Sequence, residues 1–563
     1  MLVSTSVDAH RFFADVRAVV VDEVHAFAGD DRGSHLLHVL ERVARISGQP
    51  LQRLGLSATA GNPEELLAWL QGGHPDRPRS VVNVPAPGVI EGDVTLDHVG
   101  SVGGAAKVIA TLHRGEKRLV FVDSRRRAEE LGTELRGHGI QTYLSHSSLS
   151  AGERRRSEEA FADARDCVIL ATSTLELGID VGDLDRVIQL GAPRTVASFL
   201  QRLGRTGRRP GSVRNCLFLA LDHAELLDAA GLLLRWSQGW VEPVTAPVSP
   251  RHIVAQQVLA LALQEKAIGV RTWPEWWPGL GPVAADGDAI FEHLLAEGYL
   301  DRDGDLAFIG PEAERRFGRR HFMELMAVFT APPEFVVLDG RREIGSVGDD
   351  VLLADPEGTS RVLLLGGRAW QVTHVDWKRR RCFVEATDLP GKARWSGLGA
   401  GLSFEITRGM RDVVLGDEPR GVTFSRRATE AVTDLRDHHA GDVDGASTVL
   451  RQDGGLHWWT WAGTGANRTL LASLPGVVDL VQRAGDQLLR LRHGIDPRHA
   501  GEVLTDHEAG ELASPRANDA AVRGLKFSAA LPGELARQTV EMRLSDLVAA
   551  RRVLTEPRVR KQD

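Results

Sequence analysis

The sequence predicts an α/β protein of several domains, and three observations carry this prediction. The chain has 563 residues, which at about 150 residues per domain corresponds to roughly four domains. Short aliphatic runs alternate with longer stretches of helical period over residues 17–222, as in a parallel sheet wrapped by helices. Hydrophobic residues make up 42% and charged residues 26% of the chain, the balance of an ordinary globular protein.

Seven aliphatic runs without polar alternation are expected to be strands covered on both faces. They lie at residues 18–21, 53–56, 119–122, 142–144, 168–171, 187–190 and 216–219. The Pro/Gly-rich stretch 72–92 divides the predicted strands into two groups, and its composition predicts a linker. We therefore expect a short first domain over 1–72 and a second α/β domain over about 93–245.

After about residue 250 the pattern changes. Helical periodicity over 253–263 and 289–300, followed by a fold-back around Asp303-Gly304, predicts a winged helix at about 250–325. Runs of β type separated by Gly and Asp turns over 334–386 predict a small barrel or curled sheet. We expect residues 326–563 to form a C-terminal α+β module that contains this β-barrel part.

Composition argues against several classes of protein. No apolar run approaches the roughly 18 residues of a membrane helix, and Asp8 and His10 interrupt the stretch where a signal peptide would be apolar. We therefore expect a cytoplasmic protein without a membrane partner. Cys167, Cys216 and Cys382 are too far apart to support a disulfide framework or a Cys-based metal site. The net charge of −8 leaves nucleic-acid binding open, because binding depends on a local basic surface.

Two adjacent acids, Asp22 and Glu23, follow the first predicted strand, at the end where open α/β sheets bind ligands. Such a pair suits hydrolysis of a nucleoside triphosphate: Asp22 can hold Mg²⁺ through water, and Glu23 can orient and deprotonate the attacking water. An isolated pair of this kind is more often the solvated end of a strand. The hydroxyls of Ser57 and Thr59, after the second strand, can link this site to a neighbouring domain.

The segment 201–209 gives the strongest signal. On a helix, Gln201, Arg205 and Arg208 share one face, and the glycines between them let a backbone or a phosphate approach. Guanidinium groups from an adjacent domain stabilise the transition state of phosphoryl transfer, so Arg205 and Arg208 are candidate arginine fingers. The alternative is a solvated basic face or a general nucleic-acid patch.

Loops rich in hydroxyl groups follow three further strands. Such side chains, together with backbone amides, can hold nucleic-acid phosphates without reading sequence, although each is more often a helix cap. The candidates for this role are Ser124, Arg125, His146, Thr172 and Thr174.

Together these segments resemble the motifs of superfamily 2 helicases, in the right order and at the expected strand ends. Motif II corresponds to 22–25, motif III to 57–59, motif IV to 121–125, motif V to 172–180 and motif VI to 201–208. Downstream, residues 256–257, 319–325, 340–344 and 392–397 look like the winged helix and following domain of the Lhr (large helicase-related) proteins. The resemblance covers roughly residues 16–402.

The resemblance implies two RecA-like helicase domains, the first incomplete, followed by the winged helix and the Lhr-type module. It implies ATP and Mg²⁺ as cofactors, 3′ to 5′ movement on single-stranded DNA, unwinding of DNA or RNA–DNA duplexes, and a role in DNA repair. Asp22, Glu23, Gln201, Arg205 and Arg208 would be catalytic, with Asp22 holding Mg²⁺ through water. Residues that would contact the nucleotide or couple the domains are His25, Ser57, Thr59, Gly178 and Asp180.

Arg394 and Trp395 are further candidates for binding nucleic acid, because Lys392 and Arg394 just before the indole can meet phosphates in Lys392-Ala393-Arg394-Trp395. An aromatic ring stacks on any base, which suits a motor that moves on every sequence. The usual fate of a tryptophan is the core, and the competing tryptophans are Trp276, Trp277, Trp458 and Trp459.

One departure from the family is serious. The phosphate-binding loop Gly-x-x-x-x-Gly-Lys-Ser/Thr occurs nowhere in this sequence, and only 21 residues precede Asp22. Without that lysine and its backbone amides the β- and γ-phosphates lose their main ligands. We therefore expect an incomplete, inactive helicase chain, with a separate chain as one source of the missing half. The alternatives are a non-catalytic nucleic-acid-binding or strand-annealing protein derived from such a helicase, and an RNA helicase.

Overall fold

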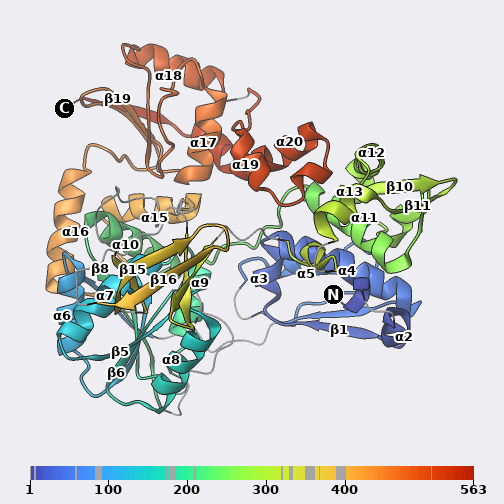
Figure 1. Ribbon diagram of the computed structural model, residues 1–563. Coiled ribbons are helices and arrows are strands. Elements are labelled where there is room, and N and C mark those ends of the chain that lie inside the picture. The colour runs from blue at the N-terminus through green and yellow to red at the C-terminus, as the bar shows by residue number, and fades with distance from the viewer. Residues whose placement is uncertain are drawn as a thin grey trace.

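The computed structural model describes most of the chain, and its elements gather around five hydrophobic cores. The described residues are 2–5, 8–57, 60–82, 92–172, 175, 184–207, 211–318, 321–328, 334–348, 362–366, 368–387, 401–508 and 510–562. Figure 1 shows a small α/β unit near the N-terminus, a larger α/β unit, a helical unit beside the first, and an upper C-terminal unit. No helix in the described part of the chain has the length and apolarity needed to cross a bilayer.

The first unit contains two parallel strands, β1 (Ala18–Val21) and β2 (Gln52–Gly55). Its helices are α1 (Leu2–Thr5), α2 (Ala9–Phe13), α3 (Val24–Ala28), α4 (Asp31–Ser47) and α5 (Pro63–Gln71). The expectation that both strands are covered on both faces is wrong for the described residues. Val20 is 60% exposed and its register partner Leu54 is 42% exposed, because the packed helices bury only the opposite face, which carries Val21.

The second unit is built on a seven-stranded parallel sheet of order β17-β3-β8-β7-β4-β6-β5. Its strands are β3 (Gly92–His98), β4 (Lys117–Val122), β5 (Gln141–Ser145), β6 (Cys167–Ala171), β7 (Arg186–Leu190), β8 (Arg214–Ala220) and β17 (Val422–Phe424). Five of these strands lie where aliphatic runs predicted them. Strands β3, at the end of the expected linker, and β17, from far downstream, were not predicted.

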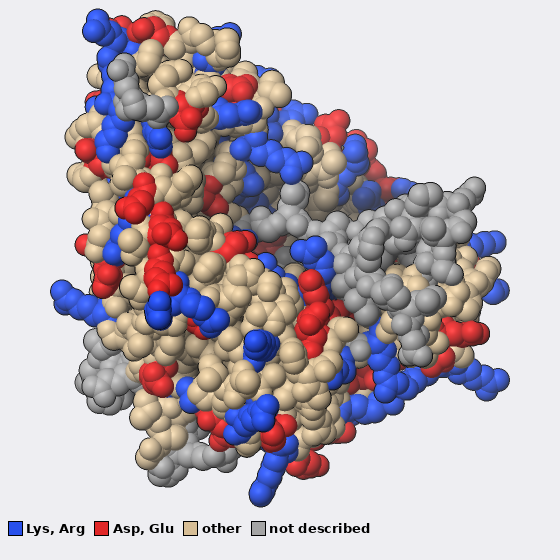
Figure 2. Space-filling model, turned by 90° about the vertical axis from the view of Figure 1, so that its left-hand side faces the viewer, with Lys and Arg blue, Asp and Glu red and all other residues tan. Residues whose placement is uncertain are grey.

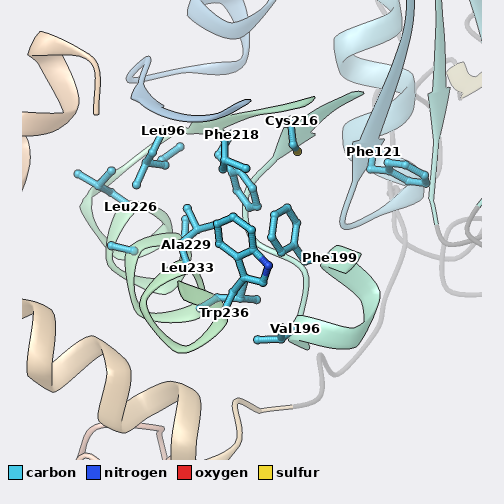
Figure 3. Close-up of a cluster of buried hydrophobic side chains, with 14 of the residues drawn as sticks. Leu96, Phe121, Val196, Phe199, Cys216, Phe218, Leu226, Ala229, Leu233 and Trp236 are labelled. Atoms are coloured by element: carbon cyan, nitrogen blue, oxygen red, sulfur yellow. The ribbon is translucent and has the colours of Figure 1, made fainter. Parts of the chain in front are cut away.

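Helices cover both faces of this sheet, which is why its strands read as continuous aliphatic runs. They are α6 (Val102–Thr111), α7 (Arg125–Gly137), α8 (Ala151–Asp163), α9 (Val196–Leu203) and α10 (His223–Ser237). On one face, Phe199 packs edge-to-face with both Phe218 and Trp236, at centroid distances of 5.3 Å (Figure 3). This packing anchors α9, which carries Gln201.

The β-type runs expected at 334–386 form a five-stranded sheet of order β13-β12-β16-β15-β14 in the described residues. The strands are β12 (Glu334–Asp339), β13 (Arg342–Gly348), β14 (Val362–Leu365), β15 (Arg368–Asp376) and β16 (Arg381–Ala386). Val337 and Trp370 share a hydrophobic core with the second unit. An isolated bridge pairs Leu149 with Gly345, and Ser346 N donates to Ser148 O at 2.6 Å. The sheet is therefore fixed to the loop that follows β5.

Residues 251–326 form a helix–hairpin unit. It contains α11 (Arg251–Glu265), β9 (Ile268–Gly269), α12 (Gly281–Ala296), β10 (Leu300–Asp303), β11 (Leu306–Ile309) and α13 (Pro311–Phe317). The expected fold-back is present: β10 and β11 pair antiparallel around Asp303 and Gly304. Most of α11 is buried on all sides, because α4 and α20 (Gly533–Leu544) also pack against it.

The expected single module over 326–563 is divided among several cores. Helices α15 (Phe404–Val414) and α16 (Arg426–His438) pack on α10 of the second unit, and a Cβ on Gly231 would lie 2.7 Å from Met410 N. Phe527 and Leu531 join the core of the helix–hairpin unit. The elements of the C-terminal unit are β18 (Thr448–Gln452), β19 (Leu456–Trp459), α17 (Gly463–Ser473), β20 (Leu488–Arg490), α18 (Pro497–Asp506), α21 (Leu547–Thr555) and β21 (Arg558–Gln562).

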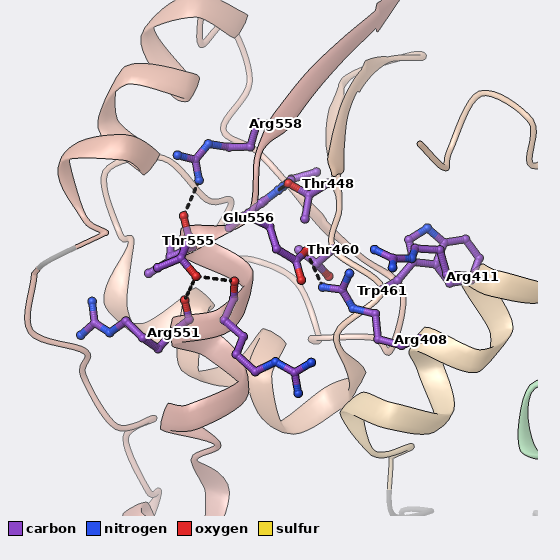
Figure 4. A network of polar contacts seen from close by, with 12 residues as sticks. Arg408, Arg411, Thr448, Thr460, Trp461, Arg551, Thr555, Glu556 and Arg558 are labelled. Carbon is purple, nitrogen blue, oxygen red and sulfur yellow. Dashed lines mark hydrogen bonds and ion pairs between the residues drawn. The ribbon is translucent and has the colours of Figure 1, made fainter. Parts of the chain in front are cut away.

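Two polar features hold this C-terminal unit together and to the rest of the chain. The C-terminal strand β21, which carries Arg558, Arg560 and Lys561, pairs parallel with β18. Arg408 of α15 donates to Glu556 at 2.7 Å (Figure 4) and lies over the ring of Phe404. Because Arg408 is 4% exposed, this ion pair is largely withdrawn from water and joins the second unit to the C-terminal unit.

Candidate nucleotide and nucleic-acid site

Asp22 and Glu23 lie at the carboxyl end of β1, as expected. Val21 is buried and Asp22 is exposed, and Asp22 Oδ1 accepts a hydrogen bond from Glu23 N at 2.9 Å. Glu23 has a positive φ of 49°, a left-handed conformation that is costly for a residue with a Cβ and is typical of functional sites. Its Oε2 atom is buried and has no hydrogen-bond partner among the described residues. Oε2 lies 3.5 Å from Nδ1 of His25, so the imidazole is placed to orient the carboxylate of Glu23.

His25 connects this strand end to two other predicted motifs. Its Nδ1 lies 2.9 Å from Ser57 Oγ, and its Nε2 lies 2.8 Å from the amide nitrogen of Gln201. An amide nitrogen can only donate, so Nε2 accepts and the ring proton is on Nδ1, facing Ser57. Burial lowers the pKa of His25, although the carboxylate of Glu23 opposes this shift. The neutral imidazole thus links the first unit to the second.

Two residues that the sequence analysis did not single out position the helix of Gln201. Arg202, 7% exposed, donates to Gln189 Oε1 at 2.5 Å and lies over the ring of Phe121. Glu242 accepts hydrogen bonds from the two N-terminal amides of α9, Val196 N at 2.7 Å and Ala197 N at 3.1 Å. The position of Arg202 next to Gln201 could have suggested its role from the sequence. No such signal pointed to Glu242, because it lies in a different segment of the chain.

Glu242 also belongs to the connection between the second unit and the helix–hairpin unit, and this connection contacts the first unit. Gly61 N donates to Glu242 O at 3.4 Å, and Val244 N donates to Asn62 Oδ1 at 2.7 Å. A Cβ on Gly61 would lie 2.2 Å from Val241 O, so only glycine permits this approach. The first unit therefore contacts the segment that caps α9 directly.

Arg205 follows α9, with its N–H bonded to Arg202 O at 3.0 Å. Gly207 has a φ of 70°, and a Cβ there would lie 2.6 Å from Arg214 Cγ. The glycine thus permits the turn that ends motif VI. Arg208, Thr59, Thr174, Gly178, Asp180, Arg394 and Trp395 lie outside the described residues.

The residues present fit Mg²⁺ and the attacking water of a nucleotide hydrolase, but not a complete triphosphate site. Asp22 is exposed at a strand end, and Glu23 Oε2 is buried without a hydrogen-bond partner in the described structure. No group of three or more acidic, His or Cys side chains forms a ready-made metal site among the described residues.

The candidates for nucleic-acid contact have different surroundings. Ser124 caps α7 by accepting from Arg127 N at 3.3 Å, and Thr172 is partly buried at the end of β6. Arg125 donates to Ser148 Oγ and lies 3.5 Å from Glu334 Oε1. Ser124 therefore has a structural role as a cap, whether or not a phosphate also approaches it.

The structure corrects the role expected for His146. The side chains of His146 and Glu129 are both 0% exposed and lie 2.9 Å apart, and Glu129 also accepts from Gly366 N at 2.6 Å. A buried imidazole cannot reach a phosphate on the surface, so His146 holds α7 and the loop after β5 together. Of the competing tryptophans, Trp277 and Trp458 are also buried, at 1% and 0% exposure.

A buried polar interface joins the first unit to the helix–hairpin unit, and no motif in the sequence pointed to it. Arg42 of α4 is 0% exposed and donates to Gln257 and Gln264 of α11. Asp31 accepts from both Nη atoms of Arg543, at 2.9 and 2.6 Å, and lies 3.0 Å from His252 Nε2. Burial alone would raise the pKa of Asp31, but His252 and Arg543 outweigh it and hold that pKa well below its usual range.

Comparisons with known proteins agree with this arrangement. The DEAD/DEAH box helicase model matches residues 1–66, and the helicase conserved C-terminal domain model matches residues 104–210. The Lhr helicase/uracil glycosylase of Escherichia coli (strain K12) is 28% identical over 478 residues, 71% of this chain and 30% of that protein. The ATP-dependent helicase Lhr-Core protein 2 of Thermococcus barophilus is 30% identical over 423 residues, 69% of this chain and 48% of that protein.

Solved structures support the fold. The Mycobacterium smegmatis helicase Lhr bound to ssDNA and AMP-PNP superposes with a TM-score of 0.68 at 22% identity, covering 100% of this chain and 80% of that one. The DUF1998 helicase MrfA bound to DNA and AMPPNP gives a TM-score of 0.52 at 22% identity, covering 69% of this chain and 55% of that one.

These findings confirm the predicted fold class, an α/β multidomain protein with RecA-like helicase domains. The fold and the His25 site define a chain of the superfamily 2 helicase type. Within that superfamily, the chain belongs to the Lhr family. The matched region spans less than half of the curated relatives described above, 30% of the Escherichia coli protein and 48% of the Thermococcus barophilus protein.

Proposed function

We propose that this chain is part of an ATP-dependent motor that moves 3′ to 5′ on single-stranded DNA, unwinds DNA or RNA–DNA duplexes and acts in DNA repair in the cytoplasm. The observation that carries the proposal is the hydrogen-bonded series Ser57–His25–Gln201, which joins the acidic strand end of the first unit to α9 of the second. A motor needs such a link, because hydrolysis between two units must change their relative position. The relative solved with ssDNA and AMP-PNP supports the choice of DNA and ATP.

The roles of the residues follow from their positions. Asp22 would hold Mg²⁺ through water, and Glu23 would orient the attacking water and take its proton on the buried Oε2. Gln201 and Arg205 would approach the same site from the second unit, Arg205 stabilising the developing charge. Bound ATP with Mg²⁺ supplies the phosphoryl group on which these residues act. Arg208, with Thr59, Gly178 and Asp180, is assigned to the site on its motif alone.

A partner segment that carries the phosphate-binding loop is part of the proposal, since the loop is absent from this sequence. The exposed face of β1 and β2 supports it. Val20 and Leu54 are paired in register and are 60% and 42% exposed, and Leu56 is 55% exposed. Parallel sheets are normally covered on both faces, so a further chain segment that covers these side chains would complete both the sheet and the nucleotide site.

The test compares the chain alone with a fusion to the loop-containing segment of an Lhr relative. We expect ATPase activity of the 563-residue chain to stay near background with or without single-stranded DNA, and the fusion to hydrolyse ATP when DNA is added. In the fusion, Glu23→Gln and Arg205→Ala should each lower kcat by about 10³-fold. Glu159→Gln and Arg155→Ala, exposed on α8, are matched controls and should leave kcat unchanged.

Three outcomes would contradict the proposal in different ways. DNA-stimulated hydrolysis by the chain alone would show that it needs no partner segment. A folded fusion that binds single-stranded DNA but never hydrolyses ATP would favour the non-catalytic binding or annealing protein. Stronger stimulation by RNA than by DNA of the same length would favour the RNA helicase.

A further inference from the structure

The turn between β15 and β16 combines an exposed tryptophan with four successive cations. Its sequence is Asp376-Trp377-Lys378-Arg379-Arg380-Arg381, and residues 377–381 are all exposed. Trp377 is 47% exposed, an unusual position for so large an apolar side chain. Elsewhere basic and acidic side chains are mixed, as on the face shown in Figure 2. This run is therefore a local concentration of positive charge on a protein whose net charge is −8.

Hydrogen bonds and packing hold the turn in one shape. Arg379 N donates to Asp376 Oδ1 at 2.9 Å, and Val336 N donates to Arg380 O at 3.0 Å. Arg380 adopts a positive φ of 52°. The indole of Trp377 packs edge-to-face on the buried ring of Phe335, with centroids 5.0 Å apart. A turn fixed in this way presents its side chains with little conformational entropy left to lose on binding.

The cations of the turn are available to a ligand. Arg379 has one acidic neighbour, Asp376 at 3.8 Å, and its side chain is still 76% exposed. In the described part of the structure, no carboxylate lies within ion-pair distance of Lys378, Arg380 or Arg381. Cations held on a rigid turn without acidic partners in the described structure are suited to bind the regularly spaced phosphates of a nucleic-acid strand.

The turn lies beside the second unit's motif IV. Val336 of β12 pairs with Arg381, and Glu334, two residues before Val336, lies 3.5 Å from Arg125. Figure 1 shows β15 and β16 lying against the second unit. The turn is thus at the end of the five-stranded sheet that faces Arg125, where the motor is proposed to hold nucleic acid.

We propose that residues 377–381 bind single-stranded DNA, with Lys378, Arg380 and Arg381 holding phosphates and Trp377 stacking on a base. The proposal rests on the proposed function and names a contact of the same strand outside the helicase motifs. Cations next to an exposed aromatic ring are the combination that binds single strands without sequence preference. A duplex would offer the phosphates but not an unstacked base.

The first experiment removes the charges from the full chain. Lys378→Ala/Arg380→Ala/Arg381→Ala should weaken binding of a fluorescent oligo(dT) 20-mer and lower the slope of log Kd against log salt by about 2, as expected for three lost phosphate contacts. The control Arg315→Ala/Arg426→Ala/Arg537→Ala removes the same charge at exposed positions on other elements. Equal losses in the two triple variants, or none in either, would overturn the proposal.

The second experiment tests the ring with two strands. Trp377→Ala should weaken binding of the oligo(dT) strand by about tenfold and leave binding of an abasic strand of the same length unchanged. Trp377→Phe keeps a ring and should lose less than about threefold. An equal loss for both strands, or an unchanged affinity for oligo(dT) in the folded variant, would contradict stacking.

The outcomes also separate this inference from the function on which it rests. If the parent chain binds neither strand, the proposed function fails and this inference fails with it. If the parent chain binds oligo(dT) and both turn variants bind it equally well, the inference alone is overturned. Melting temperatures equal to that of the parent would show that the variants are folded.

Discussion

The Nε2 atom of His25 lies 2.8 Å from the amide nitrogen of Gln201, although the two residues are 176 positions apart in the sequence. The contact spans the two α/β units, and His25 is also bonded to Ser57 through its other ring nitrogen. Because the imidazole is 9% exposed, water cannot easily replace Gln201. The distance between the two units therefore decides whether this hydrogen bond exists. Through it, the end of β1 that carries Asp22 and Glu23 is connected to helix α9.

Loss of this contact should uncouple hydrolysis from DNA. In the loop-containing fusion, Gln201→Leu should lower the DNA-stimulated kcat by about tenfold, because a buried donor–acceptor pair costs about 1–3 kcal/mol when one partner is removed. His25→Ala should act similarly, and the double variant should be no worse than either single one. Gln452→Leu, at an exposed position, is the matched control. Strictly additive losses would show that His25 and Gln201 act independently.

The contact between Asp31 and Arg543 should stabilise the packing of α4, α11 and α20, which are far apart in the sequence. Arg543→Met leaves the buried carboxylate of Asp31 with His252 as its remaining side-chain partner, and we expect a loss of about 3 kcal/mol in the free energy of unfolding by urea. The control Arg537→Met breaks an exposed pair with Glu534 on the same helix and should cost under about 0.5 kcal/mol.

The pH dependence of this contact has a defined sign. In the folded protein the pKa of Asp31 lies well below its ordinary value of 3.8, so its contribution to stability is present above about pH 4 and is lost as the pH falls further. The difference between Arg543→Met and the parent should therefore shrink on acidification below pH 4. A difference that grows with falling pH would contradict the assignment.

Asp228 of α10 should make the protein less stable as the pH rises. It lines a cavity of about 500 Å³ with Asp486, Arg483 and Arg490 of the C-terminal unit. Burial raises its pKa to about 7, with Arg194 opposing and the carboxylates of Asp486, Glu225 and Asp222 adding to the shift. The stability that Asp228 contributes is complete below the unfolded pKa of 3.8 and is lost as the pH rises toward 7.

Asp228→Asn removes this titration. We expect it to raise the free energy of unfolding at pH 8 by a few kcal/mol, at most about 4, and to change it little at pH 4. Urea unfolding at the two pH values provides the measurement, with Asp434→Asn, exposed on α16, as control. Equal effects of Asp228→Asn at both pH values would show that the carboxyl does not titrate in this range.

His146→Ala should affect stability and not DNA binding. Its imidazole and the carboxylate of Glu129 are both fully buried, so truncation leaves a buried charge and should cost about 3 kcal/mol. The melting temperature should fall, whereas the affinity of the folded protein for oligo(dT) should stay within about twofold. His138→Ala, at the exposed end of α7, is the control. A lower affinity at an unchanged melting temperature would restore the role expected from the sequence.

The predicted motifs were found where local sequence determines local structure. Aliphatic runs predicted the central strands. Polar residues that directly follow such a strand lie at the carboxyl edge of a parallel sheet, independently of distant parts of the chain. Asp22, Glu23 and Ser57 follow β1 and β2 for this reason, and His25 reaches Ser57 there. Gln201 lies on α9 and meets His25 only through packing of the two units. Strand β17 was missed because it has three residues and pairs with β3 from more than 300 positions away.

The sequence by itself determined the α/β class, the strand ends that carry the helicase motifs, and the absence of a phosphate-binding loop in this chain, because each depends on residues close together in the sequence. Only the tertiary structure decided which polar side chains are buried. Arg42 and His146 look like surface residues in the sequence, yet both are 0% exposed. A charged or polar group can leave water only where distant segments supply its hydrogen bonds, and those partners are set by packing between units.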